Sequence, residues 1–378
     1  MYKRRLNISE LLEKRSFFLF GARATGKTTL IQTSLPQALV IDLLDTRTYK
    51  ALLQDAGVLA DLIRGNQKIV VIDEIQKLPN LLDEVHRLIQ KEKRTFLLTG
   101  SSARKLKHGS ANLLAGRARE ARLFPLTWPE INAFDLVRLL NHGGLPEIYD
   151  SSEPDEDLEA YVDTYLKEEI KAEAVTRNVA AFAEFLDIIG RANGQELNYE
   201  SFSSDLQVSP STFKNYLQIL EDTLIGFRLP GFTKTKKRKA TVRAKHYLFD
   251  LGVTRHLAKA GMIRAKSKEF GDAFEHFIIL EVRAYLSYHR KKQEMSYWRS
   301  TSQFEVDLII GGRIGIEIKS ADLISDKHLK GLRALAEEKI MERLICIHTG
   351  HLASRSADGI EILPFQDFLT QLWAGDML

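Results

Sequence analysis

The sequence predicts an α/β fold with a parallel sheet at the N-terminus, a helical middle and a smaller α/β region at the C-terminus. In the first third, continuous apolar runs alternate with helical periodicity, which is typical of parallel strands covered on both faces. Helical patterns separated by polar turns follow in the middle third. In the last third, an apolar helix pattern precedes two short strand-like runs.

Four strand-like runs form the first third. They lie at 17–20, 38–42, 68–74 and 95–101, and a helical pattern at 81–91 separates the last two. The third run ends in two carboxylates, Asp73 and Glu74. In open α/β sheets, ligands bind at the carboxyl ends of the strands. The sequence therefore predicts a ligand site at this edge of the sheet.

The segment after the first strand has the pattern G-x-x-x-x-G-K-T. With the threonine that follows, its residues are Gly21, Ala22, Arg23, Ala24, Thr25, Gly26, Lys27, Thr28 and Thr29. Such a loop points backbone N–H groups and a helix N-terminus at a phosphate. We expect Lys27 to reach the β- and γ-phosphates and Thr28 to ligate Mg²⁺. Asp73 would hold the same ion, and Glu74 would polarise the attacking water. ATP and Mg²⁺ are the expected cofactors.

Composition excludes several classes of protein. The chain has 378 residues, a net charge of +4 and one cysteine, which excludes an intrachain disulfide and a cysteine-rich zinc site. Cys346 lies in an apolar run and is expected to be buried. No apolar run approaches the roughly 18 residues that a membrane span needs. We expect a cytoplasmic protein with domains at 1–152, 153–250 and 251–378.

The middle of the chain predicts two helices joined by a short turn, the first at 197–206. Ser209 is a favourable N-cap for the second, and Pro210 suits its first position. In a helix-turn-helix, Lys214 and Asn215 would lie early on the recognition helix, where they contact DNA. Winged helices also serve as protein-packing modules, so DNA contact and protein contact both stay open.

Seven basic residues follow, between strand-like runs at 226–229 and 246–249. They are Lys234, Lys236, Lys237, Arg238, Lys239, Arg243 and Lys245. This is where the wing of a winged helix would lie, and no acidic residue interrupts the cluster. Phosphate-backbone binding is the expected use, which gives affinity without sequence preference.

The last third contains a second set of candidate residues. Glu275 lies on the apolar stripe of a predicted helix, where an unpaired carboxylate is costly. The runs 304–310 and 315–320 are predicted strands. Asp307 lies on the first, and Glu317 and Lys319 share one face of the second. A surface ion pair would also explain the Glu-x-Lys pattern.

The chain resembles the AAA-type, STAND-like P-loop ATPases that have a C-terminal DUF4143 domain. The matching segments are GARATGKTTL, VVIDEIQK, FLLTGSS, LAGR, FPLTWPE, GGLP and YVDTY. The resemblance implies that Thr99 or Ser101 senses the γ-phosphate and that Arg117 is a candidate arginine finger. It also implies that Gly144 and Pro146 border the nucleotide base. A polar turn would explain Thr99 and Ser101 nearly as well, and a surface basic cluster would explain Arg117.

The second candidate set resembles the PD-(D/E)xK nuclease fold, to which the DUF4143 region is thought to be related. Val306 stands where that motif has proline. The resemblance implies that Asp307 and Glu317 hold Mg²⁺ and that Glu275 completes the metal shell. Lys319 would orient the attacking water or stabilise developing charge. Cleavage stays open, because the fold is often kept as a nucleic-acid clamp.

The sequence therefore predicts an ATP-hydrolysing protein that handles duplex or branched DNA in repair, recombination or defence. If Arg117 acts on a neighbour's nucleotide, the chain must self-associate as a ring or another homo-oligomer. One alternative is an ATP-driven signalling or scaffold switch whose winged helix contacts protein. A second alternative is an Mg²⁺-dependent DNA nuclease gated by ATP. No membrane partner is expected.

Overall fold

The computed structural model describes residues 1–65, 67–102, 118–166 and 179–377. Contacts divide the chain into two compact units, which we call the N-terminal and the C-terminal unit. The N-terminal unit contains Met1–Leu126, Leu145–Glu147 and Gln218–Ile225, and the remaining residues form the C-terminal unit. Within the described ranges, no helix is both long and apolar enough to cross a membrane.

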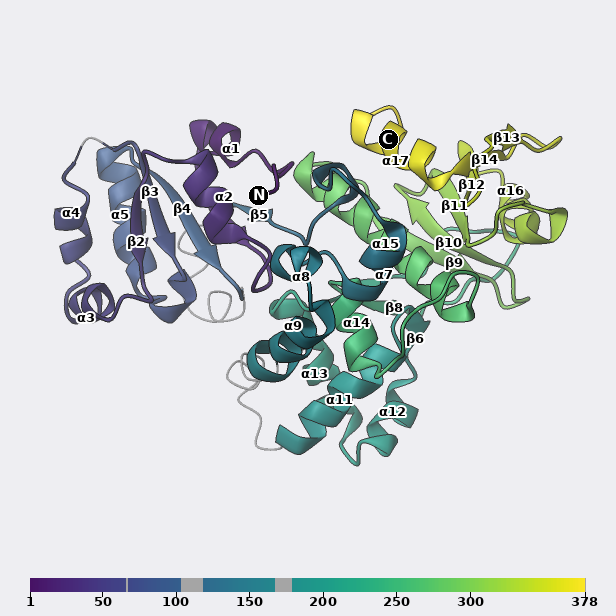
Figure 1. Cartoon of the computed structure of the whole chain (residues 1–378), viewed down its shortest axis with the longest axis horizontal. Helices are drawn as coiled ribbons and strands as arrows, with labels where there is room; N and C mark the ends of the chain where they lie inside the picture. The colour runs from purple at the N-terminus through teal and green to yellow at the C-terminus, as the bar shows by residue number, and fades with distance from the viewer. Residues whose placement is uncertain (66, 103–117, 167–178, 378) are drawn as a thin grey trace. The chain divides into compact units, whose positions relative to one another are not determined.

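The N-terminal unit is built on a five-stranded parallel sheet with the strand order β2-β3-β4-β1-β5 (Figure 1). The strands are β1 (Ser16–Phe20), β2 (Leu39–Asp42), β3 (Ile69–Asp73), β4 (Thr95–Gly100) and β5 (Ala118–Arg122). The helices are α1 (Ile8–Lys14), α2 (Lys27–Ser34), α3 (Thr46–Gln54), α4 (Val58–Leu62), the 3₁₀ turn η1 (Ile75–Lys77) and α5 (Leu81–Glu92). The predicted parallel α/β sheet is confirmed.

The strands of this sheet are apolar throughout because both faces are covered. In β1, Phe18 and Phe20 belong to one core with buried residues of α3, α4 and α5. Phe17 and Leu19 point to the other face, since side chains alternate along a strand, and both are buried as well. Helix α1 packs on β1 and β4. This double cover leaves the carboxyl ends of the strands to carry the polar residues.

The C-terminal unit begins with a mainly helical part. Its elements are the 3₁₀ turn η3 (Trp128–Glu130), α7 (Leu136–His142), α9 (Pro154–Ala160), the π-helix η4 (Tyr161–Leu166), α11 (Val179–Arg191), α12 (Tyr199–Asp205) and α14 (Leu251–Leu257). Helices α8 (Pro146–Asp150) and α13 (Pro210–Asp222) contribute residues to both units. Residues 167–178, which follow η4, lie outside the described ranges.

A small antiparallel sheet accompanies these helices. Its order is β6-β8-β7, with β6 (Gln195–Glu196), β7 (Gly226–Leu229) and β8 (Lys245–Leu248). Helices α12 and α13 are joined by a short turn in which Gln207 has a φ of 52°. The Ser209 hydroxyl accepts a hydrogen bond from the Thr212 N–H at 3.1 Å, as predicted for an N-cap. Phe185 and Phe213 pack edge to face between α11 and α13, 5.4 Å apart.

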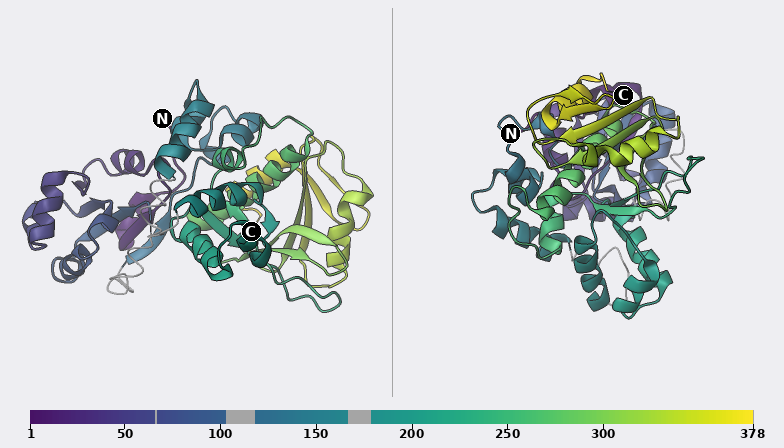
Figure 2. Two further views of the ribbon diagram at one scale, coloured as in Figure 1. Left: turned by 90° about the horizontal axis from the view of Figure 1, so that it is seen from below. Right: turned by 90° about the vertical axis from the view of Figure 1, so that its right-hand side faces the viewer.

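The rest of the C-terminal unit is a six-stranded mixed sheet with the order β13-β14-β12-β11-β10-β9, whose strands lie side by side in yellow-green in Figure 2. The strands are β9 (Met295–Arg299), β10 (Glu305–Ile310), β11 (Ile314–Lys319), β12 (Arg343–His348), β13 (Ser354–Arg355) and β14 (Glu361–Pro364). The helices are α15 (Lys268–Tyr288), η5 (Asp326–Leu329), α16 (Lys330–Ala336) and α17 (Phe365–Ala374). Cys346 is fully buried on β12, as expected, and burial raises the pKa of its thiol to about 12.

Candidate functional site

The glycine-rich loop of the N-terminal unit connects β1 to α2. Gly26 caps α2 with a φ of 89°, a left-handed conformation that favours glycine. At Gly21, an added Cβ would lie 2.6 Å from the Leu123 carbonyl oxygen, so a larger residue does not fit. The side chain of Lys27 is buried and donates hydrogen bonds to the carbonyls of Gly21, at 2.8 Å, and Ala22, at 3.3 Å. The lysine ammonium is therefore inside the loop that would surround a phosphate.

The other residues of the loop divide into buried supports and exposed groups. Thr25 is fully buried, and its hydroxyl donates to the Ala22 carbonyl at 2.7 Å. Ala24 has a φ of 62°, which is the left-handed region. Thr28 and Thr29 are exposed on the first turn of α2, and Arg23 is exposed in the loop. The Thr28 hydroxyl is thus accessible to an ion at the N-terminus of α2, as the predicted Mg²⁺ role requires.

The two carboxylates predicted to assist hydrolysis lie at the carboxyl end of β3. Asp73 is buried, and its carboxylate accepts a hydrogen bond from the Thr99 hydroxyl of the neighbouring strand β4. The same Thr99 oxygen accepts from the Glu74 N–H at 3.2 Å. Glu74 has a φ of 59°, which turns the chain sharply after the strand. The structure therefore brings Asp73, Glu74 and Thr99 together.

Gln76 belongs to this site although sequence analysis gave it no role. It is buried in η1, and its amide nitrogen donates to the Glu74 carboxylate and to the Ser101 hydroxyl, the latter at 3.2 Å. An added Cβ at Gly100 would lie 2.5 Å from the Gln76 amide oxygen, so this glycine makes room for the amide. Only its position two residues after Glu74 could have indicated this role.

Two more residues of the N-terminal unit lie against the loop. The Pro146 Cγ is 3.8 Å, and the Arg4 guanidinium 3.4 Å, from the position of an added Cβ at Gly26. Arg4 also donates to the carbonyls of Thr25 and Phe124, both at 2.5 Å. Pro146 is therefore next to the loop. The structural role of Arg4 could not be predicted, because the sequence shows only that the N-terminus is basic.

Two residues implied by the resemblance have a different outcome. The Gly144 N–H donates to the buried carboxylate of Asp250 at 2.7 Å, and Asp250 also caps α14 through the Val253 N–H at 3.0 Å. Burial raises the pKa of Asp250 to about 6. Gly144 is thus held by a residue of the C-terminal unit, and its predicted place beside a nucleotide base stays a prediction. Arg117 lies outside the described residues.

A second polar centre lies in the C-terminal unit, where β10 begins and β11 ends. We call Glu275, Glu305, Asp307 and Glu317 the carboxylate cluster. Lys245 lies among them: its Nζ is 2.7 Å from Glu305 Oε1 and 3.2 Å from Glu275 Oε1. Lys319 Nζ is 2.5 Å from Glu317 Oε1 and 3.6 Å from Asp307 Oδ2. The structure thus brings together the four residues that sequence analysis selected here and adds Lys245 and Glu305.

Further donors complete the cluster. The Tyr247 hydroxyl donates to Glu275 Oε1 at 2.6 Å, and the Ile318 N–H donates to Asp307 Oδ2 at 2.7 Å. Burial, together with the charge of Asp307, raises the pKa of both Glu275 and Glu317. Burial alone would lower the pKa of Lys245, but the surrounding carboxylates outweigh it and raise that pKa. The ammonium of Lys245 is therefore charged at neutral pH.

The cluster does not have the geometry predicted for a metal site. Among the described residues, no group of three or more His, Cys, Asp or Glu side chains is arranged to hold a metal ion. Two lysine ammonium groups occupy the space between the carboxylates instead. The prediction that Glu275, Asp307 and Glu317 hold Mg²⁺ therefore does not fit this arrangement. The prediction that Lys245 contacts DNA does not fit either, because its side chain is only 7% exposed.

The loop between β7 and β8 carries the other six predicted DNA-binding residues of the basic run. Lys234, Lys236, Lys237, Lys239 and Arg243 are exposed. Arg238 differs, because it is half-buried and pairs with Glu337 at 2.7 Å. Glu338 accepts hydrogen bonds from the N–H groups of residues 236 to 238, and Thr241 N–H donates to Arg299 O at 2.8 Å. We call residues 230–244 the basic loop. It is fixed along the six-stranded sheet, not extended into solvent.

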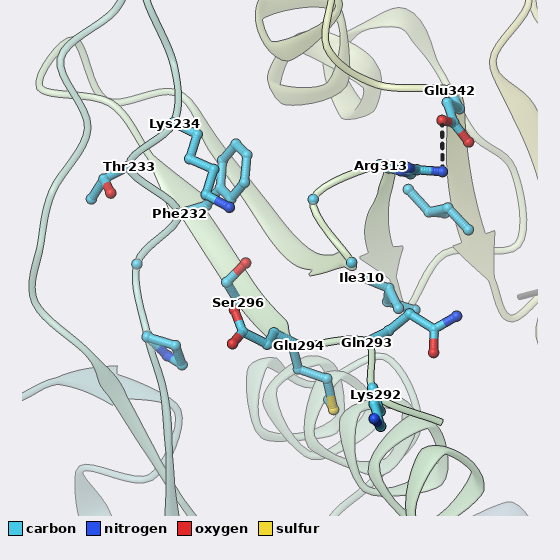
Figure 3. Close-up of a pocket in the computed structure, with 16 residues that line it drawn as sticks. Phe232, Thr233, Lys234, Lys292, Gln293, Glu294, Ser296, Ile310, Arg313 and Glu342 are labelled. Carbon is cyan, nitrogen blue, oxygen red and sulfur yellow. Dashed lines mark ion pairs between the residues drawn. The ribbon is translucent and has the colours of Figure 1, made fainter. Parts of the chain in front are cut away.

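One end of the basic loop lines a pocket of about 780 Å³ (Figure 3). Lys234, Lys292 and Arg313 lie around it, from three different segments. Arg313 pairs with Glu342 at 3.3 Å, shown as a dashed line in Figure 3. On α13, Lys214 and Asn215 are exposed, as a recognition helix requires, and Lys214 Nζ lies 5.8 Å from the centre of the Tyr199 ring.

Comparison with known proteins supports the interpretation of the N-terminal unit. Residues 13–132 match the family model of an AAA domain. Residues 133–263 and 270–368 match two domains of unknown function, DUF8612 and DUF4143. The chain is 26% identical to uncharacterized proteins of Mycobacterium tuberculosis and Mycobacterium bovis over 371 residues, 93% of this chain and 80% of each relative. An uncharacterized Haemophilus influenzae protein is 23% identical over 258 residues, 63% of this chain and 62% of the relative.

These matches confirm the AAA domain and the C-terminal DUF4143 domain that the motifs predicted. The match to an AAA domain covers the glycine-rich loop and both carboxylates at the end of β3. It indicates a nucleotide-binding domain of the ATPase type. The STAND-like character and the relation to PD-(D/E)xK nucleases stay predictions.

Proposed function

We propose that the chain is an ATPase that couples ATP hydrolysis to the handling of DNA. One observation supports the ATPase part above all others: Lys27 bonds to the loop that follows β1, and Asp73 bonds to Thr99 at the carboxyl ends of β3 and β4, which lie in the same sheet as β1. A phosphate-binding loop, a metal-binding carboxylate and a polar sensor are the parts that phosphoryl transfer needs, since its catalysis depends on positioning and charge stabilisation.

Each residue has a distinct role in this proposal. Lys27 leaves the carbonyls of Gly21 and Ala22 to neutralise the β- and γ-phosphates. Thr28 and Asp73 hold Mg²⁺, which when bound neutralises charge on the phosphate oxygens. Glu74 orients and polarises the attacking water. Their donor set fits this ion, because it consists of a hydroxyl and a carboxylate, the oxygen ligands that Mg²⁺ prefers.

Thr99, Ser101 and Gln76 connect the phosphate site to Glu74. Thr99 bonds both to the Asp73 carboxylate and to the Glu74 N–H, and Gln76 bonds to Glu74 and Ser101. A γ-phosphate that takes up the Ser101 hydroxyl therefore alters the partners of Gln76. In this way, nucleotide occupancy changes the orientation of Glu74.

The DNA part of the proposal depends on the basic loop and α13. Five exposed basic residues project from a backbone that Glu338 and β9 hold in place. A rigid array of cations loses little conformational entropy when it contacts phosphates. The helix pair α12–α13 with the three-stranded sheet has the element order of a winged helix, which favours duplex DNA as the partner.

Self-association is part of the same proposal. An arginine finger at Arg117 would act on the nucleotide of a neighbouring copy, so hydrolysis would require a ring or another homo-oligomer. The alternative of a signalling or scaffold switch assigns the exposed face of α13 to a protein partner. A DNA nuclease gated by ATP has less support, because lysines fill the carboxylate cluster.

The test is phosphate release by the full chain, measured in parallel without DNA and with single-stranded, duplex and junction DNA. Lys27→Ala is the control for contaminating ATPases. We expect hydrolysis that Lys27→Ala removes and that one DNA form stimulates. Hydrolysis with no DNA binding at low salt would contradict DNA handling and favour the switch. Equal activity in wild type and Lys27→Ala would contradict the ATPase proposal itself.

A further inference from the structure

The carboxylate cluster contains enough acidic groups for a metal site. The cations that pair with these groups, however, are two lysine ammonium groups of the chain itself. We propose that Lys245 is a built-in cation that takes the place of a divalent metal in the carboxylate cluster, and that removing its ammonium group converts the cluster into a Mg²⁺ or Mn²⁺ site. The inference concerns the C-terminal unit and does not depend on ATP hydrolysis.

Lys245 bridges two carboxylates that belong to different elements. Its Nζ contacts Glu275 on α15 at 3.2 Å and Glu305 on β10 at 2.7 Å. Tyr247, two residues further along β8, donates to the same oxygen of Glu275. Glu275 Oε1 therefore already accepts from two donors of β8. A metal ion could use this oxygen only by displacing them.

Lys319 pairs with the other two carboxylates of the cluster in the same way. Its Nζ lies 2.5 Å from Glu317 and 3.6 Å from Asp307. Each of the four carboxylates thus contacts a lysine. A divalent ion at the centre would be repelled by two ammonium groups a few ångströms away, in surroundings where solvent screens charge poorly.

Lys245 reaches the cluster from a separate part of the unit. It is the first residue of β8, directly after the basic loop, whereas the carboxylates belong to α15 and the six-stranded sheet. Its side chain also lies 5.1 Å from the centre of the Tyr297 ring, a favourable place for a cation. Two of the four carboxylates, Asp307 and Glu317, are buried, and burial of charge requires compensation. If Lys245 is removed, a cation with oxygen ligands is the natural replacement.

The experiment measures thermal unfolding of the nucleotide-free full chain in chelator and in millimolar MnCl₂. It compares wild type with Lys245→Ala, with the charge-conserving Lys245→Arg and with Lys239→Ala, a matched control that removes an exposed lysine of the basic loop. Without nucleotide, the glycine-rich loop contributes no metal site of its own. Mn²⁺ binding is counted on the same samples by electron paramagnetic resonance.

We expect Mn²⁺ to raise the midpoint of Lys245→Ala by about 5 °C and to leave the other three proteins unchanged within about 1 °C. In the double variant Lys245→Ala/Asp307→Asn, the Mn²⁺ effect should disappear. A wild-type chain that binds Mn²⁺ and loses it in Asp307→Asn would overturn the proposal. A folded Lys245→Ala variant whose unfolding midpoint does not change with Mn²⁺ would overturn it as well. If Lys245→Ala does not fold in either buffer, Lys245→Gln replaces it, with the same expected and contradicting results.

Discussion

The two polar centres of this chain hold their carboxylates in opposite ways. At the end of β3, Asp73 is bonded to a hydroxyl and Glu74 to an amide, both neutral groups. In the carboxylate cluster, Lys245 and Lys319 each bridge two carboxylates. In the proposed function, the first centre uses the charge of Asp73 to hold Mg²⁺. In the second, a lysine of the chain pairs with every carboxylate, so residues of the same type form a proposed ligand site in one place and an ion-pair network in the other.

The largest expected effect tests the first centre. Glu74→Gln keeps the size and the hydrogen bond to Gln76 but removes the base, so phosphate release should fall by about 100- to 10,000-fold. Binding of a fluorescent ATP analogue should change little, because Glu74 acts on the water. The matched variant in the other centre, Glu317→Gln, should leave phosphate release unchanged. Comparable losses in the two variants would remove the distinction between the centres.

The second prediction concerns the stability of the C-terminal unit. Lys245→Ala leaves the half-buried carboxylates of Glu275 and Glu305 without their cation, and the roughly 3–5 kcal/mol that breaking a fully buried pair typically costs is the upper limit expected for the loss in free energy of unfolding. Lys239→Ala, at an exposed position of the same loop, should cost less than about 0.5 kcal/mol. Urea unfolding monitored by tryptophan fluorescence measures both, since Trp298 is buried on β9. Equal stability of the two variants would mean that Lys245 is not an essential partner of the cluster.

A third prediction uses a buried carboxylate with neither a metal nor a lysine as partner. Glu281 on α15 accepts from the Trp128 N–H at 2.7 Å and from Trp373 Nε1 at 2.9 Å, and burial raises its pKa to about 8. The folded state therefore holds a proton that the unfolded state releases above its ordinary pKa of 4.5. The contribution of Glu281 is fully present below that value and is lost as the pH rises toward 8.

This loss amounts to about 1.4 kcal/mol per pH unit at most. Glu281→Gln keeps one acceptor oxygen and cannot ionise, so the difference in unfolding temperature between wild type and this variant should change between pH 5 and pH 8. Thermal unfolding across that range measures it. Parallel curves for the two proteins would show that Glu281 does not titrate in this window.

The smallest expected effects concern the salt dependence of DNA binding by the exposed lysines of the basic loop. If the five exposed basic residues of the basic loop contact DNA, the logarithm of the binding constant should fall with the logarithm of salt with a slope of about −4.5. Lys236→Ala should make this slope less steep by about 1. Fluorescence anisotropy with a labelled duplex at several salt concentrations measures the slope. No change for Lys236→Ala would exclude this lysine from the contact.

The first third of the chain was predictable because its signals are local. Continuous apolar runs define parallel strands, and the glycines of the loop are required by a left-handed φ at Gly26 and a close carbonyl at Gly21. Asp73 and Glu74 follow from their position at a strand end. Gln76 was missed because its role depends on the hydroxyl of Ser101, directly after β4, which no spacing around β3 reveals.

The C-terminal centre could be predicted only in part. Periodicity placed Glu275, Asp307 and Glu317 on the correct elements, and the structure brings them together. Lys245 was assigned to the surface because it ends a run of basic residues. Its burial depends on β8 packing beside α15 and β10, a long-range arrangement without a sequence signature. Because Lys245 is buried beside these carboxylates, the predicted metal site is an ion-paired cluster in the structure.

The most direct measurement is the number of Mn²⁺ ions bound to the wild-type chain, counted by electron paramagnetic resonance with and without a non-hydrolysable ATP analogue. We predict a single tightly bound Mn²⁺ per chain in the presence of the analogue and none in its absence. Asp73→Asn should lose this ion, whereas Asp307→Asn should keep it. Tight Mn²⁺ binding without nucleotide, abolished by Asp307→Asn, would contradict the distinction between the two centres.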